Sequence, residues 1–263
     1  MAINNTGGKI KPVENESGGG WMETVRTVVF AILFAVLIRT FAYEPFNIPS
    51  GSMVPTLLVG DYLFVSKFSY GYSRHSLPFS LPLIEGRIFE SSPERGDVAV
   101  FKLPTDNRTD YIKRIIGLPG DRIQVIRGVL HINDKAVRRR RLEDYGIPTQ
   151  TGRYQTSPQY LETLPNGVAH VILESGGDRA MLDNTEIFVV PKRHFFVMGD
   201  NRDNSSDSRV PVGLSGHFGF VPIENLVGRA EFLFFSTNGF AKIWEIWKWP
   251  FSIRFNRLFN SID

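Results

Sequence analysis

The sequence predicts a mostly β protein with one transmembrane helix near its N-terminus. Most of the chain consists of short apolar runs rich in β-branched residues, and these runs end at pairs such as Gly-Asp, Pro-Gly and Asn-Asp. Short runs separated by turn residues are typical of β-strands. The one long apolar segment, residues 21–43, carries no charge between Arg26 and Arg39.

The composition limits the classes of function. A chain of 263 residues can bury a substantial core in one large domain or two small ones. Cysteine is absent, which excludes disulfides and thiol catalysis, and no histidine has a recognisable catalytic spacing. The formal net charge of +3 is too small to indicate nucleic-acid binding. The aromatic content of 13% favours contact with a membrane interface.

Residues 21–43 are interpreted as an uncleaved membrane anchor that follows a polar, disordered tail, residues 1–20. The uncharged run is shorter than the about 20 residues that span hydrocarbon, but arginines near both ends can extend to the headgroups. Two alternatives are a buried soluble helix and a cleavable signal peptide, for which Thr40-Phe41-Ala42 is a loose cleavage site. A signal peptide rarely follows so long a polar tail, and a buried helix would need a soluble partner.

Residues 46–57, with the sequence FNIPSGSMVPTL, predict a stiff turn that presents a hydroxyl. Glycine allows another backbone to come close, and each proline fixes its own φ. A serine hydroxyl is a poor nucleophile until a neighbouring base takes its proton. The candidate base is Lys113, within a β-branched run that predicts a buried strand. Burial lowers the pKa of a lysine from its usual ~10.4 by disfavouring the charged form, which arginine does not allow.

Four motifs resemble the conserved boxes of bacterial type I signal peptidases, a family of serine–lysine proteases. They occur in the order of that family: PSGSM at residues 49–53, RGDVAVF at 95–101, YIKR at 111–114 and GDNRDNSSDSR at 199–209. The resemblance implies strongly twisted antiparallel sheets, no cofactor and the removal of signal peptides from exported preproteins. It also implies that Ser52 is the nucleophile, that Lys113 is the general base, and that Ser50 joins the Ser52 backbone N–H in the oxyanion hole. Ser50 could instead only cap the turn.

The motif at residues 199–209 is expected to support the site. By resemblance, Ser205 hydrogen-bonds and orients the lysine. The charged residues expected to brace the site are Asp207, Arg209 and Arg114. The alternatives are a loop that satisfies its own backbone and a calcium loop. The calcium loop fails on position, because the sixth residue from Asp203 is Ser208 rather than glycine and the twelfth is Leu214 rather than glutamate. No metal ligand set is expected.

The resemblance also places shallow apolar pockets beside the nucleophile. Bulky walls would admit Ala and Gly and exclude larger residues, and an extended peptide could add to the neighbouring strand edges. Around the residue before the cut the expected lining is Ile48, Pro49, Met53, Leu57, Tyr111 and Ile112. Near the residue two positions further back it is Phe46, Leu63, Val100 and Asp110.

The expected domain order is a catalytic β core in two parts, residues 44–122 and 196–236, with a smaller inserted β subdomain at 123–195. Strands are predicted within residues 95–103, 195–200 and 226–235, and on both sides of a Gly60-Asp61 turn within 57–72. In the insertion, residues 123–137 predict a hairpin with an Asn133-Asp134 turn, and 168–173 a strand. The four arginines of residues 138–141 predict a solvated face, available to lipid headgroups or an acidic partner.

Two segments are candidates for membrane contact. Residues 77–84 form an apolar loop broken by prolines, which either packs on the body or dips into the membrane surface. The C-terminal segment, residues 237–263, is basic and aromatic, and residues 238–259 predict a helix in the membrane interface, with packing against the protein as the alternative.

The resemblance implies a single-pass protein of the bacterial inner (cytoplasmic) membrane, with a cytoplasmic N-terminus and a periplasmic catalytic domain. The expected partners are preprotein signal peptides and the lipid bilayer, with the secretion translocon as a further candidate and no nucleic acid. Three rivals stay open. A self-cleaving serine–lysine regulator would begin with a helix-turn-helix, a silent envelope scaffold would have lost Ser52 or Lys113, and a relative could be specialised for one envelope or conjugation substrate.

Overall fold

A computed structural model describes residues 20–77, 80–148, 154–239 and 245–262. Apart from Gly20, the predicted N-terminal tail lies outside the described residues. The chain divides into an N-terminal unit, residues 1–37, and a large unit, residues 38–263.

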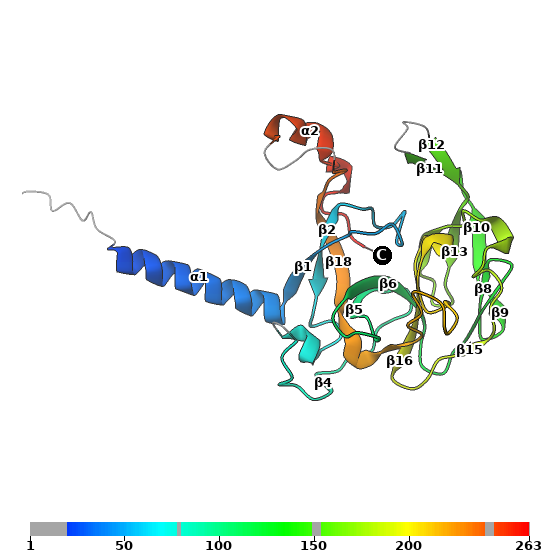
Figure 1. Ribbon diagram of the computed structural model, residues 1–263, viewed down its shortest axis with the longest axis horizontal. Helices are drawn as coiled ribbons and strands as arrows, with labels where there is room; N and C mark the ends of the chain where they lie inside the picture. Colours follow the sequence, from blue (N-terminus) through cyan, green and yellow to red (C-terminus); the bar gives the residue numbers. More distant parts are fainter. Residues whose placement is uncertain (1–19, 78–79, 149–153, 240–244, 263) are drawn as a thin grey trace, which may run out of the picture. The chain divides into compact units, whose positions relative to one another are not determined.

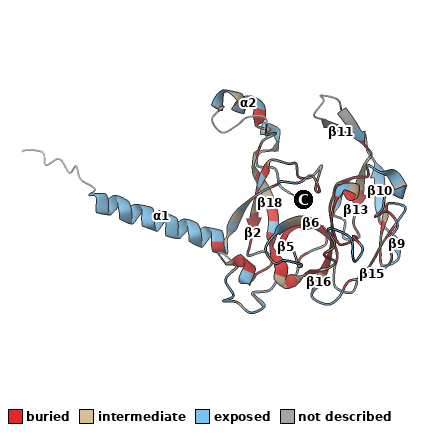
Figure 2. Cartoon of the chain, viewed as in Figure 1, coloured by how far each residue is buried: buried red, intermediate tan, exposed pale blue. Residues whose placement is uncertain are grey.

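One helix, α1 (Trp21–Phe41), dominates the N-terminal unit and confirms the predicted apolar helix (Figure 1). Its 21 residues extend over about 31 Å at 1.5 Å per residue, close to the about 30 Å of hydrocarbon in a bilayer. Its apolar side chains, such as Phe30 and Phe34, are exposed, as the pale blue of the helix shows in Figure 2. By length and composition, α1 is a candidate membrane span.

The large unit is built around a seven-stranded antiparallel sheet, which confirms the predicted mostly β fold (Figure 1). The strand order is β1-β2-β18-β5-β6-β16-β17. The strands are β1 (Tyr43–Asn47), β2 (Asp61–Ser66), β5 (Val98–Lys102), β6 (Asp110–Gly117), β16 (His194–Met198), β17 (Val221–Pro222) and β18 (Leu226–Ser236). The register of β18 shifts against both β2 and β5, and such bulges increase the twist of a sheet.

Strand β5 shows how the sheet is buried. Val98 and Val100 belong to one buried apolar cluster, whereas Ala99 and Phe101 belong to a second. Successive side chains of a strand point to opposite faces, so both faces of β5 are covered. The strands predicted within residues 95–103, 195–200 and 226–235 correspond to β5, β16 and β18 and are confirmed.

The strand predicted before the Gly60-Asp61 turn is wrong. Residues 57–60 form a bend and a turn, in which the Leu57 N–H donates to the Met53 carbonyl, the Leu58 N–H to the Asp61 carboxylate and the Asp61 N–H to the Leu58 carbonyl. These local bonds use the donors and acceptors that a strand would offer to a neighbour. The predicted strand after the turn is β2.

Residues 122–189 form smaller sheets between β6 and β16. One sheet contains β15 (Phe188–Val189), β7 (Arg122–Ile126), β8 (Val129–Ile132) and β9 (Lys135–Ala136). The others contain β10 (Arg138–Arg141), β13 (Gln159–Thr163) and β14 (Ala169–Leu173), and the pair β11 (Tyr145–Pro148) and β12 (Tyr154–Ser157). Ile123 and Val125 share a buried cluster with Ile116, Phe196 and Met198, so this region shares a core with the main sheet. The boundaries proposed for a separate subdomain stay a prediction.

The hairpin predicted over residues 123–137 is present, but its turn lies elsewhere. β7 and β8 are joined at Arg127-Gly128, where both residues have positive φ, 49° and 71°. Arginine gives no signal for this conformation, so the turn could not be predicted from its residue types. Asn133-Asp134 forms the next turn, between β8 and β9. The arginine run is strand β10, and three of its four side chains are exposed, as predicted for a solvated face.

The C-terminal segment is not one helix within the described residues. It contains the short turns η6 (Ile246–Lys248), α2 (Trp249–Ser252) and η7 (Phe255–Arg257). The Arg254 N–H donates to the Ser236 carbonyl, and the Arg257 guanidinium lies 2.6 Å from the Asp61 carboxylate. These bonds tie the segment to the sheet instead of continuing a helix, which corrects the prediction. Its aromatic side chains are nevertheless exposed: Trp247, Trp249, Phe251, Phe255 and Phe259.

Residues 77–84 are flanked by β3 (Tyr72–Ser73), η1 (Arg74–Ser76) and β4 (Arg87–Ile88). Positions 78 and 79 lie outside the described residues. Leu81 and Leu83 are exposed in an irregular segment, as expected of a loop, and contact of this loop with a membrane stays a prediction.

Candidate active site

The turn that carries Ser52 is fixed at both ends. Before it, the Ile48 N–H donates to the Asp61 carbonyl at 2.8 Å. After it, the side chains of Met53 and Leu57 are fully buried. The Asn201 backbone N–H donates to the Ser52 carbonyl at 3.0 Å, so the loop of residues 199–209 holds the turn from a second side.

Lys113 reaches this turn from β6. The strand pairs with β5, which places Lys113 opposite Ala99. Only 3% of Lys113 is exposed, and its Nζ lies 2.5 Å from the Oγ of Ser52. The sheet therefore brings the predicted nucleophile and the predicted base into hydrogen-bonding contact.

Burial lowers the pKa of Lys113 to about 8. Asp207 and Asp200 act in the opposite direction, because a negative charge favours the ammonium ion, and Arg209 adds to the lowering. The pKa stays below the usual value because the amine has lost its water and the acidic groups nearby are bound to arginines. At pH 7 about one lysine in ten with such a pKa is neutral, against fewer than about one in a thousand in water.

Ser50 lies at the mouth of the site. Its Oγ is 3.4 Å from the Ser52 Oγ, at the outer limit of a hydrogen bond, and its side chain is exposed. A hydroxyl in this place can turn toward an oxygen that develops negative charge next to Ser52.

Arg114 and Asp200 form a buried ion pair beside the dyad of Ser52 and Lys113. Arg114 Nε and Nη2 donate to the two Asp200 oxygens at 2.9 and 2.8 Å, and Nη1 donates to the Gly96 carbonyl at 2.7 Å. Asp200 also accepts from the Thr56 hydroxyl at 2.5 Å. This ion pair therefore connects three of the four sequence motifs, those at residues 95–101, 111–114 and 199–209. The hydrogen bond from Thr56 connects it to the turn that carries Ser52. The sequence analysis did not identify Thr56 or Asp200 as site residues.

Asp207 and Arg209 also pair within the loop of residues 199–209. Arg209 Nε and Nη2 lie 2.9 Å from the Asp207 oxygens, and the Gly199 N–H donates to the same carboxylate at 3.0 Å. Ser205 is buried, but its Oγ has no hydrogen-bond partner among the described residues. The expected hydrogen bond from Ser205 to Lys113 is thus not formed in this structure, and a role for Ser205 stays a prediction.

A groove of about 510 Å³ opens in front of Ser52 and Lys113. Seven of the ten residues expected to contact substrate line it: Phe46, Ile48, Pro49, Val100, Asp110, Tyr111 and Ile112. The other three, Met53, Leu57 and Leu63, are fully buried in the same apolar cluster as Ile48 and Val100, so they pack against the wall. Polar lining residues that the sequence analysis did not name are Asn47, Thr109, Asn201, Asn204 and Ser206. Three of these belong to the 199–209 motif, whose polar composition was the available signal.

Comparison with known proteins identifies the family of the chain. Residues 21–235 match the family described as signal peptidase, peptidase S26. The chain is 42% identical to signal peptidase I of Rickettsia canadensis, over 90% of this chain and 92% of that protein. It is 43% identical to signal peptidase I of Rickettsia conorii, over 89% and 90% of the two chains. A crystal structure of a signal peptidase I from Enterococcus faecalis aligns with a TM-score of 0.31 and 25% identity, covering 53% of this chain and 97% of that one. The chain belongs to the signal peptidase family S26, whose members are serine peptidases that hydrolyse peptide bonds.

Proposed function

We propose that this protein removes signal peptides from preproteins with a Ser52–Lys113 dyad. The observation that carries the proposal is the 2.5 Å contact between the Lys113 amine and the Ser52 hydroxyl, in a place where burial lowers the pKa of the lysine to about 8. A neutral amine at that distance is a base ready to accept the serine proton.

The reaction has two halves. In the first, Lys113 takes the Ser52 proton as Oγ attacks the carbonyl carbon of the scissile bond. The negative charge on the carbonyl oxygen is held by the Ser52 backbone N–H and the Ser50 hydroxyl. The Lys113 ammonium then gives its proton to the leaving amine, and an acyl-enzyme remains on Ser52. In the second half, Lys113 activates a water molecule that hydrolyses this ester.

The groove supports a preference for small residues before the cut. Ile48 and Ile112 line it beside Ser52, and Ile48 is almost fully buried, so the wall cannot retreat to admit a large side chain. β1 is an edge strand of the sheet and Phe46 lines the groove, which allows an extended peptide to pair with this edge.

Membrane anchoring by α1 completes the proposal. Resemblance to the family places the N-terminus in the cytoplasm and the catalytic unit on the outer side. An anchored enzyme meets a membrane-bound substrate at raised effective concentration. The exposed aromatics of the C-terminal segment, including Trp247 and Phe251, are suited to the lipid interface, although the described part of the segment is not one continuous helix. The secretion translocon is a further candidate partner.

A direct test is to incubate the purified protein, in non-ionic detergent, with a preprotein that carries a signal peptide. N-terminal sequencing of the product should show a single cut after a small residue at the end of the signal peptide. A protein that cuts only its own chain, for example near Ala42, would favour the self-cleaving regulator.

A further inference from the structure

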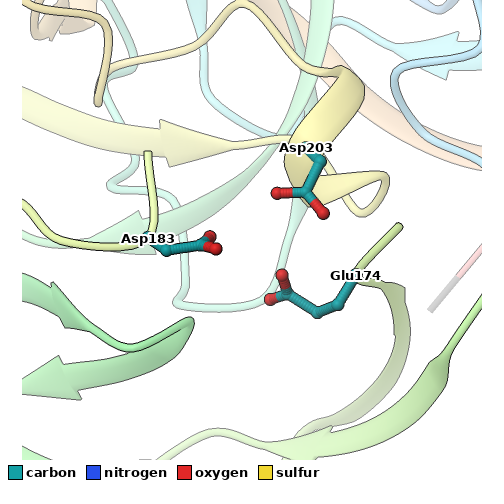
Figure 3. Close-up of side chains that lie close together, drawn as sticks. All are labelled: Glu174, Asp183 and Asp203. Carbon is teal, nitrogen blue, oxygen red and sulfur yellow. The ribbon is translucent and has the colours of Figure 1, made fainter. Parts of the chain in front are cut away.

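Three carboxylates from separate segments converge, and none of them lines the groove in front of Ser52 and Lys113 (Figure 3). Glu174 directly follows β14, Asp183 precedes β15, and Asp203 lies in η4 (Arg202–Asn204). One oxygen from each side chain lies within 4.8 Å of the other two. Glu174 and Asp183 are buried and Asp203 is half-buried, so this is not an acidic patch on the surface.

Two oxygens of this cluster have no hydrogen-bond partner among the described residues. They are Oε2 of Glu174, a residue that is only 3% exposed, and Oδ1 of Asp203. The aspartates are held in place through their other oxygens: the Gly176 N–H donates to Asp203 at 2.7 Å and the Ala180 N–H to Asp183 at 2.6 Å. A buried carboxylate oxygen without a partner is costly, so Glu174 Oε2 and Asp203 Oδ1 are suited to bind an additional positively charged or donor group.

Two arginines nearby donate hydrogen bonds to groups outside the cluster. The guanidinium of Arg202 is bound to Glu162 through both of its terminal nitrogens. Arg139 Nη1 lies 3.9 Å from Glu174 Oε1, beyond hydrogen-bonding distance, and donates to the Gly128 carbonyl instead.

We propose that Glu174, Asp183 and Asp203 form a binding site for a divalent cation, with Ca²⁺ as the preferred ion. Three carboxylates are the hard oxygen ligands that Ca²⁺ and Mg²⁺ take in proteins. Ca²⁺ accepts irregular sets of oxygen ligands, whereas Mg²⁺ demands near-octahedral geometry and keeps several of its waters. Three buried or half-buried carboxylates from separate segments therefore favour Ca²⁺. The sequence predicts no metal site because positions 174, 183 and 203 match no ligand motif.

The cation would link the segments of Glu174 and Asp183 to the loop of residues 199–209, which contains Asp203. The Leu173 N–H already donates to the Asp200 carbonyl at 2.9 Å, and Asp203 is two residues before Ser205. An ion bound to Glu174 and Asp203 would thus hold the loop of residues 199–209 in addition to its bonds to the Ser52 turn. Bound Ca²⁺ is expected to stabilise the folded protein by mass action.

The test uses the full-length protein in non-ionic detergent, stripped with a chelator and titrated with CaCl2 at pH 8.5 by calorimetry. We expect one Ca²⁺ per chain, a higher Tm with Ca²⁺, and weaker binding of Mg²⁺. Glu174→Gln should weaken Ca²⁺ binding at least ~10-fold, because a neutral amide replaces one charged ligand. Glu186→Gln is the matched control, since Glu186 is exposed in the same loop as Asp183 and should bind Ca²⁺ like wild type.

Equal Ca²⁺ binding by wild type and Glu174→Gln would overturn the site. So would the absence of Ca²⁺ binding by wild type. Tighter binding of Mg²⁺ than of Ca²⁺ would overturn the choice of ion. If Glu174→Gln fails to fold by circular dichroism, Asp203→Asn takes its place with the same expected loss.

Discussion

The amine of Lys113 lies 2.5 Å from the hydroxyl of Ser52, although 61 residues separate them in the chain. Lys113 belongs to β6 and Ser52 to the turn after β1, and β2, β18 and β5 lie between these strands in the sheet. The pair therefore depends on the register of the whole sheet, and its chemistry depends on the burial of the lysine.

Replacing Lys113 should stabilise the fold while it removes activity. The pKa of Lys113 is about 8 in the folded protein and about 10.4 when solvated. Between about pH 8 and 10.4 the lysine is protonated in the unfolded chain but neutral in the folded protein, so the free energy of unfolding rises with pH across this range. Below about pH 8 the folded protein bears the full cost of the buried ammonium ion. At pH 7 that cost is about 3 kcal/mol. Lys113→Met should raise the unfolding free energy by about 1–3 kcal/mol at pH 7 and by almost nothing near pH 10.5.

Urea unfolding in detergent at several pH values measures this difference. Lys135→Met, at an exposed position, is the control and should change stability little at either pH. A loss of stability for Lys113→Met at every pH would contradict the burial cost.

Removing Asp200 should be strongly destabilising. Arg114 is fully buried and loses both carboxylate contacts in Asp200→Ala, which leaves a buried charge without its partner. Such losses cost about 3–5 kcal/mol. The control is Arg122→Ala, which breaks the exposed pair with Asp134, where both side chains are about half exposed or more. That change should cost less than about 1 kcal/mol. Equal midpoints of chemical unfolding for the two variants would contradict the role of the buried pair.

A methyl group at Gly199 should displace the turn that carries Ser52. A Cβ there would lie 2.2 Å from Ser205 Oγ and 2.5 Å from the Ser52 carbonyl oxygen, both too close. The Ser205 side chain can rotate, but the Ser52 backbone must move, so Gly199→Ala should lower kcat at least ~10²-fold. At Gly51 the nearest atom to an added Cβ is 3.7 Å away, so Gly51→Ala is the matched control and should fold with wild-type stability. Wild-type kcat for Gly199→Ala would show that the turn tolerates displacement.

Shortening Ile112 should relax the selection of the residue before the cut. Ile112 lines the groove and packs on the cluster that contains Ile48, so Ile112→Ala removes part of the wall and enlarges the groove. We expect kcat/KM for a substrate with Val or Leu at that position to rise ~10-fold relative to Ala, since one or two methylenes are worth about 1–3 kcal/mol. Peptide competition assays measure the ratio, and an unchanged ratio would place the specificity wall elsewhere.

Residue type and motif order predicted that Ser52 and Lys113 lie together, but not the residues that hold them in place. The sequence contained the apolar helix, the strands β5, β16 and β18, and the candidate dyad. The pairing of Arg114 with Asp200 could not be predicted from the sequence, because long-range partners follow from strand register rather than from local pattern. The C-terminal segment was predicted as one helix from its amphipathic composition, but tertiary bonds from Arg254 and Arg257 to the sheet override that preference.

The central claim is that a neutral Lys113 activates Ser52. The most direct measurement is cleavage of a preprotein in detergent by wild type, Ser52→Ala and Lys113→Ala, with kcat/KM of wild type followed across pH. We expect both folded variants to lose ~10³-fold or more, and wild-type activity to rise with pH through an apparent pKa near 8. Activity retained by folded Lys113→Ala, or a wild-type rate that does not change between pH 6 and 9, would contradict the account.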